Sequence, residues 1–161
     1  MNTLIFETSN FSLEIHPRPF VSRKEGGHIK VVSKDPAIQD RTMFSPYVAL
    51  EFMWLSSIAG KALENAMNKQ GINVVKVNYE ELGNWAYKEG RKPTFHLHIF
   101  GRTSDAKIQV FPEAVQLPAR ESGFYDMFEP LSESDIELIR KEIEVLANQD
   151  KYKKELWKLD S

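Results

Sequence analysis

The stretch TFHLHIF, residues 94–100, decides the fold. Large apolar side chains alternate with other types along it, which is the period of a β-strand with one buried face. Three apolar side chains fall on one face and supply part of a core. Thr94, His96 and His98 fall on the other face, where the two imidazoles stand side by side. The stretch therefore predicts a sheet strand that carries reactive groups.

The rest of the chain supplies further strands around this one. Alternation and β-branched content predict strands at residues 4–6, 11–15, 29–32, 73–78 and 94–100, with residues 108–110 as a candidate sixth. The first two strands are expected to form an opening hairpin within residues 1–15, because the intervening Thr, Ser and Asn favour a turn. Residues 83–93 are expected to form a loop.

Two helices are predicted from capping residues and apolar periodicity. Ser45 and Pro46 favour the start of a helix, and an apolar stripe at helical spacing follows over residues 48–67. Ser132 and Asp135 resemble a capping box at the start of a second helix. The order of strands, long helix, strands and final helix favours an α+β fold with an antiparallel sheet.

Composition narrows the class of protein. The 161 residues, 42% of them hydrophobic, suit a single domain spanning residues 1–161. A net charge of −2 gives no positive field for nucleic acid or an anionic membrane, so a small metabolite is the expected partner. The absence of cysteine excludes disulfides and thiolate chemistry. No apolar run has the length of a signal or membrane segment, and we expect a cytoplasmic protein.

A pair of strand histidines has several uses. It can be inert on a half-exposed strand, hold a metal, activate a nucleophile, or attack a substrate itself. Gly90 ahead of His96 and His98 imitates the motif of metal-binding cupin barrels, which also needs a carboxylate shortly after the second histidine. Residues 102–104 are Arg, Thr and Ser instead, and the long helix argues against an all-β barrel. A His-based metal site is therefore the weaker alternative.

Three segments of the chain resemble the histidine-triad (HIT-like) superfamily. Residues 27–34, GHIKVVSK, resemble its Gly-His strand, and Ser45-Pro46 with the helix that follows resembles its next element. Residues 94–102, TFHLHIFGR, resemble its triad segment. The similarity spans residues 11–102. It implies a HIT-like fold, with about five antiparallel strands, a long central helix and a C-terminal helix, and an arm and helix over residues 103–161.

The resemblance assigns roles within the triad strand. The family's Arg follows the last triad histidine by four residues, as Arg102 follows His98, so His96 holds the middle, nucleophilic position. Thr94 holds the first position, where the full triad has histidine. The resemblance implies attack by neutral His96 on the α-phosphate of a nucleotide, with His98, Thr94 and His28 beside it. It implies no metal and no cofactor.

The remaining expectations concern binding. Asn78 or Asn84 takes the family's ribose role. Phe20 lies where the family builds part of its base pocket, with core packing as the competing account. Arg91 and Lys92 could stabilise phosphate oxygens, although a solvated basic turn explains them equally well. His16 is expected to be structural or exposed.

Two function classes stay open. One is an enzyme, a nucleotide phosphohydrolase or nucleotidyl transferase that acts on dinucleoside polyphosphates or nucleoside phosphoramidates. The other is a nucleotide-binding module with little turnover, for which Thr94 is the warning sign. The family also suggests a homodimer.

Overall fold

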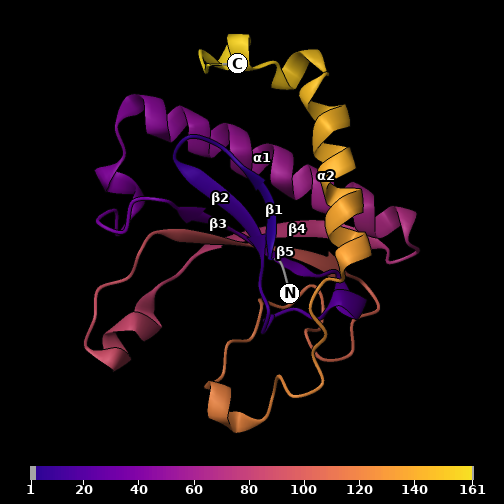
Figure 1. Ribbon diagram of the computed structural model, residues 1–161. Coiled ribbons are helices and arrows are strands. Elements are labelled where there is room, and N and C mark those ends of the chain that lie inside the picture. Colours follow the sequence, from indigo (N-terminus) through magenta and orange to yellow (C-terminus); the bar gives the residue numbers. More distant parts are fainter. Residues whose placement is uncertain (1–2, 161) are drawn as a thin grey trace.

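The computed structural model describes residues 3–160 and contains one five-stranded antiparallel sheet (Figure 1). The strand order is β1-β2-β3-β5-β4. The strands are β1 (Leu4–Glu7), β2 (Phe11–Ile15), β3 (His28–Ser33), β4 (Val74–Glu81) and β5 (His96–Thr103). This arrangement confirms the predicted α+β fold with five antiparallel strands. The opening hairpin is also present in the described part of residues 1–15, as β1 and β2.

The long helix α1 (Pro46–Lys69) covers one face of the sheet, as Figure 1 shows. Its start follows the sequence prediction, because the Ser45 side chain accepts a hydrogen bond from the Val48 N–H and Pro46 begins the helix. Its apolar stripe packs against the core face of β5, which presents Leu97 and Ile99, and against Phe95 just before that strand. The other face of β5 is thereby turned away from α1.

The C-terminal helix α2 (Glu133–Ala147) packs against α1. The expected capping box is present, since Ser132 and Asp135 each accept a hydrogen bond from the other's backbone N–H. Two short 3-10 helices follow, at Asp150–Tyr152 and Lys154–Trp157. None of the helices within residues 3–160 is both long and apolar enough to cross a membrane.

An extended arm, residues 104–131, lies on the sheet face opposite α1 (Figure 1, orange). The predicted strand at residues 108–110 is wrong. The backbone of this segment does not pair with a strand. The N–H groups of Lys107, Ile108 and Gln109 instead donate hydrogen bonds to the carboxylate of Glu25. A carboxylate accepts several backbone N–H groups without a partner strand, so β-type sequence here produces a pinned loop.

The arm has a small apolar cluster of its own. Buried side chains from the arm meet Phe20 and Phe100 beneath it, and the cluster consists of Phe20, Val21, Phe100, Val115, Tyr125 and Phe128. Residues 83–93 also depart from a plain loop, since Asn84–Glu89 forms a 3-10 helix on the same side of the sheet. The arm and this short helix flank the polar face of β5.

Candidate functional site

All four histidines of the chain form one row on the sheet face turned away from α1. Successive ring centroids are 4.7 Å apart for His16 and His28, 5.0 Å for His28 and His98, and 4.8 Å for His98 and His96. Strand pairing produces the row, since β3 lies directly beside β5. We call these four side chains the histidine row.

A hydrogen bond chain fixes the tautomers of two members of the row. The Phe20 N–H donates to His28 Nδ1 at 3.0 Å, so the His28 proton sits on Nε2. That Nε2 lies 2.8 Å from His98 Nδ1, which must then accept. The neutral His98 ring consequently carries its own proton on Nε2, the atom that can donate to a substrate.

A separate hydrogen bond fixes His96. Its Nδ1 lies 2.8 Å from the carbonyl oxygen of Thr94. Because a carbonyl only accepts, His96 carries its proton on Nδ1 and keeps the lone pair on Nε2. This is the arrangement that a nucleophilic imidazole needs. Thr94 makes this contact through its backbone.

Burial keeps the row neutral. It lowers the pKa of His98 to about 2 and that of His16 to about 3, and it also lowers the pKa of His28 and His96 from the usual 6.5. Neighbouring imidazoles and the nearby cations, Lys30 among them, add to the effect at His98 and His16. At neutral pH the row therefore consists of uncharged donors and lone pairs.

The structure brings some of the predicted site residues together. Phe20 is buried against the row, with its ring 5.5 Å from both His28 and His98. Asn78 lies on β4 opposite Phe100, and its amide oxygen accepts a hydrogen bond from Arg102. His28, His96, His98, the Thr94 carbonyl and Phe20 thus form one contiguous site.

The other predicted residues lie on the segment before β5. Asn84, Arg91 and Lys92 are exposed. Arg91 forms an ion pair with Glu89, yet it is close enough to lower the pKa of His96. Of these three side chains, only Arg91 has an interaction with the histidine row, through its charge on His96.

Sequence reasoning missed three members of the site. His16, expected to be structural or exposed, instead stacks on His28 at an interplanar angle of 22°. Lys30 on β3 pairs with His98 across the strands, and Arg120 reaches the site from the arm. His16 carries a usable signal, because it continues the polar alternation of Ser12 and Glu14 on β2. Arg120 carries no comparable local signal.

Two features of the resemblance have structural explanations. Arg102 is buried, and its Nη2 donates to the carbonyl oxygens of Gln109, Val110 and Glu113, so it holds the arm. Gly101 lies against Gly26, where a side-chain Cβ on Gly101 would come within 2.2 Å of the Gly26 carbonyl oxygen. The Gly-Arg pair therefore has a packing role and does not touch the histidine row.

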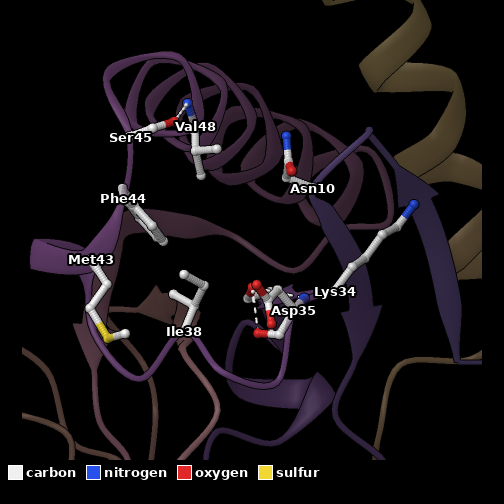
Figure 2. A pocket seen from close by; sticks show the side chains of 9 residues that line it. Asn10, Lys34, Asp35, Ile38, Met43, Phe44, Ser45 and Val48 are labelled. Carbon is white, nitrogen blue, oxygen red and sulfur yellow. Dashed lines mark hydrogen bonds between the residues drawn. The ribbon is translucent and has the colours of Figure 1, made fainter.

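The pocket drawn in Figure 2 is separate from this site. It encloses about 270 Å³ beside the start of α1, between Asn10, Ile38 and Phe44. Its charged residues have internal partners, since Lys34 pairs with Glu7 and Asp35 accepts the Ala37 N–H. Within residues 3–160 no group of three or more His, Asp or Glu side chains is arranged to hold a metal ion.

No protein-family model and no curated protein matches the sequence. Solved structures do match. A histidine triad protein from Bradyrhizobium japonicum shares 16% identity at a TM-score of 0.61, over 87% of this chain and 89% of that one. One from Marinobacter aquaeolei VT8 shares 16% at 0.60, over 89% and 90%.

A zinc-bound histidine triad family protein from Mycobacterium smegmatis shares 18% identity at a TM-score of 0.58, over 91% of this chain and 87% of that one. The similarity thus extends over most of each chain. The chain therefore has the histidine-triad (HIT-like) fold.

Proposed function

We propose that the protein is a nucleotide phosphohydrolase or nucleotidyl transferase that acts at the α-phosphate through a nucleotidyl intermediate on His96. The observation that carries the proposal is the hydrogen bond between His96 Nδ1 and the Thr94 carbonyl. It holds the imidazole in the tautomer whose Nε2 lone pair is available to attack phosphorus. The fold neighbours named as histidine triad proteins support the same chemistry.

The first step exchanges one bond to phosphorus for another. The Nε2 lone pair of His96 forms a bond to the α-phosphorus, and the bond from phosphorus to the leaving oxygen or nitrogen breaks, with its electron pair going to the leaving group. His98 Nε2–H, oriented by the chain through His28, donates to a phosphoryl oxygen or to the leaving atom.

The second step restores the enzyme. Water attacks the nucleotidyl phosphorus and releases a proton to the solvent, the bond from phosphorus to His96 Nε2 breaks, and the neutral imidazole returns with its electron pair. In a transferase a second phosphate takes the place of water. Because burial holds the pKa of His96 below 6.5, the imidazole is already unprotonated at pH 7 and needs no separate base.

The binding assignments remain proposals. We place the oxygens of the attacked phosphate near the exposed Arg91 and Lys92, and the ribose near Asn78 or Asn84. Phe20, the predicted base contact, is buried beneath the Arg120 guanidinium, so we assign its ring to holding Arg120 and not to stacking on the base. Asn84 is exposed, whereas Asn78 already binds Arg102 through its amide oxygen, and that difference favours Asn84.

We test the reaction with wild type and His96→Ala on diadenosine polyphosphates, adenosine phosphoramidate and nucleotide sugars, with chelator present. The expected result is turnover by wild type alone, with a mass increase of one nucleotidyl group on a peptide that contains His96. A His96→Ala variant that turns over these substrates as fast as wild type would show that His96 is not the nucleophile.

A nucleotide-binding module with little turnover is the second candidate. The observation that favours it is Thr94, which puts a small hydroxyl side chain where the full triad has an imidazole. Nucleotide binding by wild type without turnover, and without any nucleotidyl peptide after substrate is added, identifies this function. Calorimetry with AMP and mass spectrometry of the same sample separate the two candidates.

We also propose that two copies of the chain form a homodimer through α1 and β4. β4 is an edge strand of the sheet, and the groove between it and α1 is bordered by exposed Met53, Val75 and Tyr79. Tyr79 lies over Gly60, so the apolar surfaces of helix and strand are continuous. An unpaired strand edge next to an apolar surface suits pairing with a second copy.

A further inference from the structure

We propose that Arg120 of the arm binds a phosphate group of the substrate beyond the one that His96 attacks, and so selects for substrates with a phosphate chain. The inference rests on the proposed function and deepens it by naming the substrate class. It also gives the arm a role in recognition. The arm holds this guanidinium over Phe20, beside the histidine row.

Arg120 is held in place from several directions. Its guanidinium carbon lies 4.0 Å from the ring centroid of Phe20 and 4.6 Å from that of Tyr125. One Nη2–H donates to the carbonyl oxygen of Arg18 at 2.8 Å. Aromatic faces and a carbonyl fix the orientation of the plane without neutralising its charge. The remaining N–H groups are oriented before any ligand arrives.

No acidic side chain within residues 3–160 forms an ion pair with Arg120. Burial lowers the pKa of Arg120, and the positive charge of the neighbouring Arg18 lowers it further. The positive charges of Arg18 and Arg120 repel each other, and an anion bound between them would reduce that repulsion. Arginine also presents parallel N–H groups that match two phosphate oxygens. The arrangement therefore suits a phosphate.

The position along the row identifies which phosphate. The Arg120 guanidinium carbon lies 4.0 Å from the Phe20 ring centroid, and that ring lies 5.4 Å from His16 and 5.5 Å from both His28 and His98, the members of the row other than the nucleophile. Arg120 thus lies toward the far end of the row from the nucleophile. A phosphate chain attacked at His96 and running past His98 ends beside Arg120.

Lys30 adds charge along the same path. It lies opposite His98 across β3 and β5, and its Nζ is 3.4 Å from a Glu14 carboxylate oxygen. Lys30 therefore places a second cation, itself paired with Glu14, beside His98. A substrate with a single phosphate, such as a nucleoside phosphoramidate, leaves Arg120 without a ligand.

The first experiment measures binding without turnover. Inorganic tripolyphosphate is titrated by calorimetry into His96→Ala protein and into the same protein with Arg120→Gln. We expect Arg120→Gln to weaken tripolyphosphate binding at least tenfold, and raised salt to weaken binding to the Arg120 protein more steeply. Lys107→Gln is the matched control, since it removes one exposed cation from the same arm. Because His96 is absent, this result does not depend on the chemistry.

The second experiment compares substrates. Arg120→Gln in the otherwise wild-type protein should raise KM for diadenosine tetraphosphate at least tenfold and change kcat/KM for adenosine phosphoramidate less than threefold. Equal losses on both substrates, or unchanged tripolyphosphate binding, would overturn the inference. If Arg120→Gln lowers Tm, Arg120→Lys decides, because lysine keeps the charge over the rings: it must bind tripolyphosphate more tightly than Arg120→Gln, and equal weakness contradicts the proposal.

Discussion

His28 Nε2 lies 2.8 Å from His98 Nδ1, and this contact orients the proton of His98 toward the substrate side. We predict that His28→Phe lowers kcat about 10- to 100-fold with little change in KM, because His98 then loses its fixed tautomer. Steady-state kinetics together with a pH–rate profile test this. A purely structural His28 would instead give a lower Tm with kcat unchanged for the folded fraction.

The value of kcat/KM should fall at a lower pH than it would if the nucleophilic histidine were exposed. Protonation of His96 Nε2 removes the nucleophile, and burial places its pKa below 6.5. At pH 6.5 more than half of the neutral form therefore remains, so kcat/KM should exceed half of its plateau value. An acidic limb centred at or above pH 6.5 in the wild type would contradict this.

Stability should fall with acid for a related reason. The pKa of His16 is about 3 in the folded protein and near 6.5 in an unfolded chain, so the unfolded state binds the extra proton first. The contribution of His16 to the free energy of unfolding is close to zero above pH 6.5, and it becomes more destabilising as the pH drops toward 3. We predict that His16→Asn flattens the fall in unfolding free energy between pH 6.5 and 4. Equal slopes for variant and wild type would refute this.

Loss of Arg102 should loosen the arm. Its guanidinium donates to three arm carbonyls and to Asn78, all in a buried setting. Arg102→Met should lower the unfolding free energy by about 2–4 kcal/mol, because the carbonyls lose their donors. Hydrogen exchange should increase around residues 109–113.

A matched variant separates this effect from the loss of any arginine. Arg41→Met removes an exposed ion pair with Glu81 and should change the unfolding free energy by less than about 1 kcal/mol. If both variants are equally stable in denaturant titrations, Arg102 does not anchor the arm.

The proposed homodimer predicts a mass. Wild type should elute with light scattering at twice the 18.6 kDa of one chain, and Met53→Asp should shift the mass to that of one chain. Met53 is exposed, so the substitution leaves the core intact while placing a charge in the contact. Val145→Asp, on an exposed part of α2, is the control and should leave the mass unchanged.

The strands and helices followed from local rules. Alternation located β2, β3 and β5, and Ser45-Pro46 located the start of α1 to the residue. The predicted end of β4 was too early, since pairing with β5 continues it to Glu81. Strand propensity misled at residues 108–110, where a single distant carboxylate, Glu25, satisfies the backbone. Strand propensity depends on the local sequence alone and gives no information on a partner as distant along the chain as Glu25.

The sequence and the family resemblance placed the triad strand, His28 and Phe20 at the site. The positions of the histidines on β3 and β5 are fixed by period-two alternation and by the pairing of these two strands. Arg120 is 92 residues from His28 along the chain and reaches the row because the arm folds back over Phe20. No periodicity links such residues, and the structure was needed to bring them together.

The Thr94 carbonyl has a consequence for how this chain can change over generations. Every residue type offers the same backbone oxygen, so the bond that orients His96 survives any substitution at position 94 that leaves the backbone in place. The side chain there is consequently free to drift, and a lineage can exchange histidine for threonine without passing through an ancestor whose nucleophile has lost its orientation.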